Sequence, residues 1–227
     1  MNFLSHFYFD RNTPDANIVL GTILPDLLKN ANKSWNAHPE KQIELFDKSG
    51  LDKLLKGWKR HLQVDRFFHS SDFFNSKTQE LKQLLIPILT DSPVRPSFLA
   101  HIGVELLLDH LLIEQQKIAI SSFYESLEAV REDDLKDFLQ KCNIDDTDLF
   151  FKFFNGFKSS RYLLSYQKLE NISYALQRIC MRLWDHPFSE KTTYDLTVVL
   201  ASYKNQLKVD FMKIFEEIEI RLVDEHT

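Results

Sequence analysis

Apolar side chains recur at three- and four-residue intervals along most of the chain, which is the period of an amphipathic helix. The chain contains only 5 Gly and 7 Pro, which leaves little material for strands joined by tight turns. The sequence therefore predicts an all-α fold. The predicted helices cover residues 14–28 with a kink at Pro25, 39–48, 51–74, 75–91 with a bend near Pro87, 96–116, 121–140, 145–157, 161–185 and 191–224.

The helical pattern runs through the chain without an internal repeat, a low-complexity tract or a clear linker. Residues 1–227 are therefore predicted to form a single multi-helix domain, a size that one hydrophobic core can support. The 19 Phe indicate that aromatic rings make up much of this core, or line a groove, because each ring buries a large apolar area.

Two strips of polar residues interrupt the apolar pattern. His61, Asp65 and His69 follow one another in steps of four, and so do His101, Glu105 and Asp109, the last followed at once by His110. Residues four apart in a helix lie on the same face, so each strip is expected to form a polar line along one helix. The two strips predict a metal-centred site between two helices.

Imidazole and carboxylate groups on rigid helices are suitable ligands for Mn²⁺, Fe²⁺ or Zn²⁺, whereas an all-oxygen set would indicate Mg²⁺ or Ca²⁺. A bound ion of this kind acidifies water and stabilises charge on a phosphoryl oxygen, which phosphoester hydrolysis requires. Asp26, which follows Pro25 in an apolar segment, is a further candidate. It must either lie exposed or be buried with a partner.

Each candidate also has a purely structural interpretation. His6 lies in an aromatic run and is typical of a core histidine that donates to a carbonyl group, and Asp26 and Glu105 could lie on exposed helix faces. His101 could cap or pack near the start of its helix. The pair Asp109 and His110 is harder to explain in this way, because apolar residues flank it on both sides and buried polar groups need partners.

The net charge of −5 gives no reason to expect nucleic-acid binding. One local basic cluster, formed by Lys53, Lys56, Lys59 and Arg60, precedes His61 and is either a solvated face or a guide for an anionic substrate. Cys142 and Cys180 belong to no metal-binding pair and are expected to be reduced and buried. No signal peptide and no apolar run of about 18 residues stands out, so we expect a cytoplasmic protein without a membrane span.

Four segments resemble the acyl carrier protein phosphodiesterases. They are the opening MNFLSH that ends at His6, LGTILPD that ends at Asp26, RHLQVD at 60–65 and ELLLDH at 105–110. The family has an MNFLAH-like start, a G-N-L-x-x-D segment, an H-R-x-I-D motif and a D-x-x-x-D-H helix in the same order. The resemblance covers nearly the whole chain, with its specific motifs in the first half.

The resemblance implies an HD-domain-like helical core and a metal-dependent hydrolase, with Mn²⁺ favoured and Fe²⁺, Zn²⁺ or Mg²⁺ as alternatives. The enzyme would hydrolyse the phosphodiester that joins 4′-phosphopantetheine to a serine of acyl carrier protein. Acyl carrier protein, an acidic protein, would be its partner. The implied metal ligands are His6, Asp26, His61, Asp65 and Asp109. We predict that His69, His110 and Asp65 are catalytic and that Lys56, Lys59, Arg60 and Glu105 bind the substrate.

This sequence departs from the family pattern at four positions. His69 stands where the family usually has an acid, Glu105 replaces the first Asp of the last motif, and Pro25 and Gln63 also differ. These differences leave open a shift in metal preference or substrate. Two other functions therefore remain as alternatives: an HD-like hydrolase of another phosphoester such as a nucleotide, and a helical interaction protein whose polar strips are vestigial.

Overall fold

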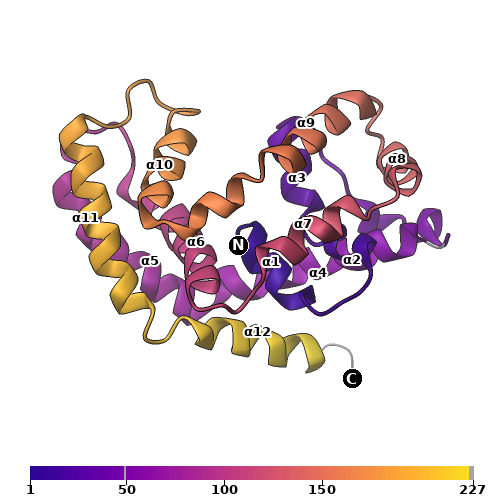
Figure 1. The fold of residues 1–227 in the computed structure, drawn as a ribbon, viewed down its shortest axis with the longest axis horizontal. Helices are drawn as coiled ribbons and strands as arrows, with labels where there is room; N and C mark the ends of the chain where they lie inside the picture. The colour runs from indigo at the N-terminus through magenta and orange to yellow at the C-terminus, as the bar shows by residue number, and fades with distance from the viewer. Residues whose placement is uncertain (49, 225–227) are drawn as a thin grey trace. The chain divides into compact units, whose positions relative to one another are not determined.

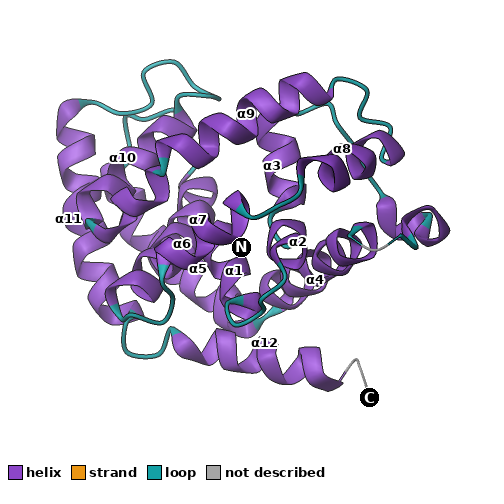
Figure 2. Cartoon of the chain, turned by 45° about the vertical axis from the view of Figure 1, so that its right-hand side comes forward, coloured by secondary structure: helices purple, strands orange, loops and turns teal. Residues whose placement is uncertain are grey.

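The computed structural model describes residues 1–48 and 50–224 of the protein. Helices make up 75% of it, and no strand occurs in these residues, which confirms the predicted all-α class (Figures 1 and 2). The α-helices are α1 (Phe3–Asp10), α2 (Ala16–Gly21), α3 (Leu24–Ala31), α4 (Leu51–Ser70), α5 (Asp72–Leu85), α6 (Pro96–Glu114), α7 (Ile120–Glu128), α8 (Glu132–Lys141), α9 (Thr147–Ser160), α10 (Leu169–Cys180), α11 (Glu190–Leu207) and α12 (Met212–Asp224). Short 3₁₀ helices are η1 (Pro39–Lys41), η2 (Ile43–Phe46), η3 (Ile86–Ile88) and η4 (Tyr162–Gln167).

The chain divides into two compact units, which we describe separately. Unit 1 consists of Met1–Ser5, Phe67–Lys117 and Leu163–Thr227, and unit 2 consists of His6–Arg66 and Ile118–Tyr162. The expectation that residues 1–227 form one domain, with an HD-like core, stays a prediction.

Helix α6 is the central element of unit 1. The run from Leu106 to Leu112 is buried on every side, as expected for a helix that is apolar all round. Helix α5 packs along α6, and α10 and α11 also contact it (Figure 1). Asp109 and His110 therefore lie in the core of this unit, where their polar atoms need partners.

By length and composition alone, α6 could cross a membrane, contrary to the sequence expectation that no such run exists. Its most apolar 18-residue window has a mean hydropathy of 1.4, and 61% of that window is buried inside the structure. A core helix of a soluble protein meets the same two criteria. The packing of α5, α10 and α11 on α6 provides the cover that such a helix needs.

In unit 2, helices α2 and α4 approach until their backbones touch. A Cβ atom added to Gly57 would lie 2.2 Å from the Ile18 carbonyl oxygen, and one added to Gly21 would lie 2.3 Å from the Leu54 carbonyl oxygen. Only glycine permits this approach. It places the carbonyl group of Thr22, just after α2, beside His61 of α4. Around this crossing, α2 packs on α7, and α3, α7 and α8 pack on α9.

Several predicted helices are divided by breaks. Pro25 does not kink a long helix but occupies the first turn of α3, where its missing N–H costs nothing. The preceding helix begins at Asp15, whose carboxylate accepts hydrogen bonds from the N–H groups of Asn17 and Ile18, rather than at Thr13 and Pro14. Ser71 caps the start of α5 and so ends the helix that was predicted to continue to residue 74. Pro96 starts α6 as predicted.

The composition of the core agrees with the sequence analysis. Most of the 19 Phe are buried, and the largest fully buried side chains are mainly Phe and Tyr. Cys142 and Cys180 are free and buried, as expected. Burial raises the pKa of both thiols to about 12, with Glu40 also raising that of Cys142, so neither thiol is a reactive nucleophile.

Candidate metal centre

Unit 2 brings together His6, His61 and Asp65, which we call the His6 group. His6 comes from α1, and the other two lie one turn apart on α4. His6 Nε2 is 3.2 Å from Asp65 Oδ1, and His61 Nε2 is 3.6 Å from Asp65 Oδ2. One ligand atom from each residue can be chosen so that all lie within 4.8 Å of one another.

A backbone hydrogen bond orients His61. Its Nδ1–H donates to the Thr22 carbonyl oxygen over 2.9 Å, which turns Nε2 toward Asp65. The His61 ring also stacks on His6, with ring centroids 4.0 Å apart and an angle of 19° between the planes. In metal sites, a hydrogen bond from the ring nitrogen that does not bind the metal fixes the tautomer of the histidine, and the bond to Thr22 would do so here.

His6 has the properties expected of a ligand. It is 1% exposed, and neither of its ring nitrogens makes a hydrogen bond in the described structure, although Nε2 lies close to Asp65. Two ligand atoms that each lie about 2.1 Å from one ion are separated by roughly 3 to 4 Å, and the two separations between imidazole nitrogen and Asp65 oxygen lie in this range. The residues present therefore fit a divalent ion, and two imidazoles with one carboxylate suit Mn²⁺, Fe²⁺ or Zn²⁺.

The protonation states in this group also favour binding of a cation. Burial, and after it the neighbouring His61, lower the pKa of His6 to about 3, so its imidazole is neutral at pH 7. Burial opposes the charge of Asp65, but the adjacent His6 and His61 hold the pKa of its carboxyl below the usual range. The neutral His6 imidazole beside an ionised Asp65 carboxylate leaves a negative charge that a metal ion would neutralise.

The low pKa of His6 predicts a pH-dependent stability for the metal-free protein. Between pH 6.5 and about 3 the unfolded chain binds a proton at His6 that the folded chain does not, so the free energy of unfolding falls as the pH falls. The contribution of this residue has a slope of about 1.4 kcal/mol per pH unit. Urea unfolding in EDTA should therefore show a steeper loss of stability from pH 6.5 to 5 for the wild type than for His6→Gln. Above pH 7.5 the free energies of unfolding of the two proteins should change with pH in parallel. Equal slopes of these free energies against pH below pH 6.5 would contradict the prediction.

Unit 1 contains a second set of possible ligands, His69, His101 and Glu105, which we call the His101 group. Glu105 Oε1 lies 3.2 Å from His101 Nε2 and 3.8 Å from His69 Nε2. The α-amino group of Met1 is 3.6 Å from the same carboxylate oxygen. Burial opposes the charge of Glu105, but the Met1 amine, His101 and His69 hold its pKa below the usual value.

The comparisons with known proteins bear on this arrangement. The model of the acyl carrier protein phosphodiesterase family matches residues 1–218 of the 227-residue chain. The chain belongs to this family. A search of curated proteins and a search of solved structures found no match.

Asp109 and His110 lie next to each other on α6 and contact different parts of unit 1. Both carboxylate oxygens of Asp109 accept hydrogen bonds from the start of the chain: Oδ1 from Ser5 N at 2.8 Å and Ser5 Oγ at 2.6 Å, and Oδ2 from Leu4 N at 3.2 Å and Asn2 Nδ2 at 2.8 Å. Asp109 thus holds the first turn of α1. Burial, opposed by the bonds from Ser5 and Leu4 and reinforced by Glu105, raises its pKa to about 7.

His110, the next residue of the family motif, faces a different set of partners. Its Nδ1–H donates to the Tyr166 carbonyl oxygen over 2.7 Å, and its Nε2 is 3.8 Å from Glu114 Oε1. Glu114 in turn is paired with Lys204 and Lys208. Asp109 and His110 belong to neither group of possible ligands among the described residues, so their predicted metal and catalytic roles stay predictions.

The remaining family positions lie in unit 2. Asp26 is in the first turn of α3, half-buried, and outside the His6 group. Lys59 and Arg60 are half-exposed on α4 and Lys56 is exposed. Arg60 and Lys56 lie close enough to lower the pKa of Asp10, although burial, the larger effect, raises it. These predicted roles are likewise untested by the structure.

His101 was placed in a polar strip by its sequence, one turn before Glu105, but it was assigned no role, because packing near a helix start explained it equally well. One participant was left out altogether. The Thr22 carbonyl that orients His61 has no counterpart in the pattern of side chains, because every residue carries the same backbone acceptor.

Proposed function

We propose that this member of the phosphodiesterase family hydrolyses the phosphodiester that joins 4′-phosphopantetheine to a serine of acyl carrier protein, and that it requires a divalent ion, with Mn²⁺ as the preferred one. The family match over residues 1–218 carries the proposal. The His6 group supports it, since its donor set and its charge fit such an ion.

In this proposal His6, His61 and Asp65 hold the ion through their Nε2 atoms and carboxylate. When bound, it would acidify a water molecule and stabilise negative charge on the phosphoryl oxygens. The protein keeps its ligands ready for binding. The Thr22 carbonyl holds the proton of His61 on Nδ1, burial keeps His6 neutral, and the adjacent imidazoles keep Asp65 ionised.

The basic residues of α4 supply the attraction for substrate in this proposal. The chain has a net charge of −5, so an acidic carrier protein must approach a region of opposite local charge. Lys56, Lys59 and Arg60 lie within the two turns that precede His61, and at least two of them exert a field that reaches the buried carboxyl of Asp10. Such a cluster can guide both the phosphodiester and the acidic surface of the carrier.

The experiment is to incubate the purified full-length protein with holo-acyl carrier protein and Mn²⁺ and to weigh the products by mass spectrometry. We expect apo-carrier protein together with free 4′-phosphopantetheine, and no conversion in EDTA. Cleavage of nucleotides or other small phosphoesters with the holo-carrier left intact would replace this proposal by the second hydrolase function. Metal binding without cleavage of any phosphoester would indicate an interaction protein.

A further inference from the structure

We propose that unit 1 holds a second divalent transition-metal ion, bound by His69, His101 and Glu105. This site is additional to the ion proposed for the His6 group. It includes His101, which lies outside the four family-like segments. The alternative is that these side chains make only ordinary ion contacts with one another. The two cases differ in a measurable quantity, the number of metal ions bound per chain.

Two of the three separations within this group fit one ion. The Nε2 atoms of His101 and His69 lie 3.2 Å and 3.8 Å from the same oxygen of Glu105. Two ligand atoms that share an ion at about 2.1 Å can be at most about 4.2 Å apart, so both separations satisfy this limit. Ligand atoms of all three residues lie within 4.8 Å of one another. His101 and Glu105 are one turn apart on α6, which gives them a rigid common support.

The two imidazoles are held in place by aromatic packing. The rings of His69 and His101 are stacked with centroids 5.1 Å apart and 16° between the planes. Phe74 of α5 presents its ring at nearly a right angle to both, at 5.1 Å from His69 and 4.9 Å from His101. Phe74 is therefore a positioning residue that limits the rotation of both rings.

The charge and the donor types define the class of ion. Glu105 is only 15% exposed, and its pKa is held below the usual value, so a carboxylate charge is largely removed from water. A positive partner stabilises such a charge. The Met1 amine supplies one in this structure, 3.6 Å from Glu105 Oε1 and 3.4 Å from His69 Nε2, and a bound ion would take its place. Two imidazoles and one carboxylate are the donor set of Fe²⁺, Mn²⁺ and Zn²⁺ sites, and the two nitrogen ligands disfavour Ca²⁺ and Mg²⁺.

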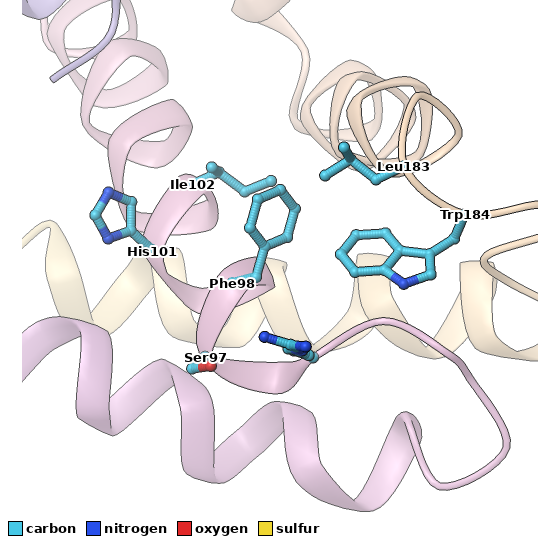
Figure 3. Close-up of a pocket in the computed structure, with 7 residues that line it drawn as sticks. Ser97, Phe98, His101, Ile102, Leu183 and Trp184 are labelled. Carbon is cyan, nitrogen blue, oxygen red and sulfur yellow. The ribbon is translucent and has the colours of Figure 1, made fainter.

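An open cavity borders His101, the member of the group that is among its lining residues. It has a volume of about 730 Å³ and is lined by Arg95, Ser97, Phe98, His101, Ile102, Leu183 and Trp184. Figure 3 shows Phe98 and Ile102 of α6 turned toward Leu183 and Trp184, with His101 on another side of the same helix. Because His101 is 45% exposed, an ion can reach its ring from solvent without unfolding of unit 1.

The test is a count of bound metal on the full-length protein after removal of metal with EDTA. Zn²⁺ is titrated by calorimetry and the dialysed complex is analysed by mass spectrometry, in parallel with Co²⁺ absorption spectra. The variants are His101→Ala and, as a second removal of a ligand, Glu105→Gln. His6→Ala removes a ligand of the other group, and His38→Ala removes an exposed histidine that belongs to neither. Circular dichroism checks that each variant is folded.

We expect two ions per chain for the wild type and for His38→Ala, and one for His101→Ala, Glu105→Gln and His6→Ala. Loss of a residue that only orients a metal ligand weakens metal affinity by about 10- to 100-fold. Loss of a ligand itself should therefore raise the dissociation constant of that ion by more than about 100-fold. If His101→Ala and Glu105→Gln bind as many ions as the wild type, the second site does not exist, whatever the result for His6→Ala. If His6→Ala alone binds as many ions as the wild type, the His6 group does not bind the ion of the proposed function, whereas the second site is supported.

Discussion

Replacement of Asp65 by Asn is expected to lower the metal-dependent phosphodiesterase activity by more than about 100-fold, since losing even an outer partner of a ligand costs 10- to 100-fold. Asn has the same shape but no charge, and Asp65 is the only carboxylate in the His6 group. The two imidazoles would then face a neutral amide, and the negative charge that attracts the ion would be gone. The rate of apo-carrier formation at saturating Mn²⁺ measures the effect.

A matched substitution separates this effect from a general loss of negative charge. Asp137 is a half-exposed residue of α8 in the same unit, and its only close partner among the described contacts is Lys141 at 3.7 Å. Exposed pairs of this kind contribute little. We expect Asp137→Asn to keep wild-type activity. Asp65→Asn with wild-type activity and metal affinity would remove the His6 group from the mechanism.

Replacement of Gly57 by Ala is expected to destabilise the protein by about 3 kcal/mol or more, the upper end of the usual cost of overpacking. The added methyl group would meet only backbone, at 2.2 Å from the Ile18 carbonyl oxygen and 2.8 Å from both Gly21 Cα and Thr22 N. Helices α2 and α4 would have to separate. The midpoint of urea unfolding should fall, and metal affinity should fall with it, because separation draws the Thr22 carbonyl away from His61.

Gly156 provides a control at which substitution by Ala should change the free energy of unfolding in the opposite direction. It lies within α9, and an added Cβ atom would meet nothing within 4 Å. Ala is favoured over Gly inside a helix by about 1 kcal/mol, so Gly156→Ala should raise the free energy of unfolding. A Gly57→Ala protein as stable as the wild type would show that the α2–α4 contact is looser than the structure indicates.

The helices could be predicted because their signal is local. The three-to-four spacing of apolar residues predicted nearly every helical segment, and Pro96 marked the start of α6. The interior breaks were missed where the apolar spacing continues across them. Phe67, Phe68 and Phe74 keep the period through Ser71, and only the bond from Phe74 N to the Ser71 hydroxyl shows that a new helix has begun there.

The candidate site was partly predictable for the same reason. The step of four from His61 to Asp65 placed both on one face of α4, and the structure keeps them together. The same step grouped Asp109 with Glu105, yet Asp109 is occupied by the N–H groups of Leu4 and Ser5, about a hundred residues earlier in the chain. Spacing along one helix says nothing about which distant donor reaches a side chain.

The sequence by itself determined the all-α class, the polar strips on α4 and α6 and, through its motifs, the family. These depend on helical period and on residue identity, which can be read from consecutive positions. Only the tertiary structure decided that His6 stacks on His61, that Thr22 orients it and that His101 joins His69 and Glu105. Those relations depend on how closely helices approach, and in unit 2 that approach is set by two glycines that lack a Cβ atom.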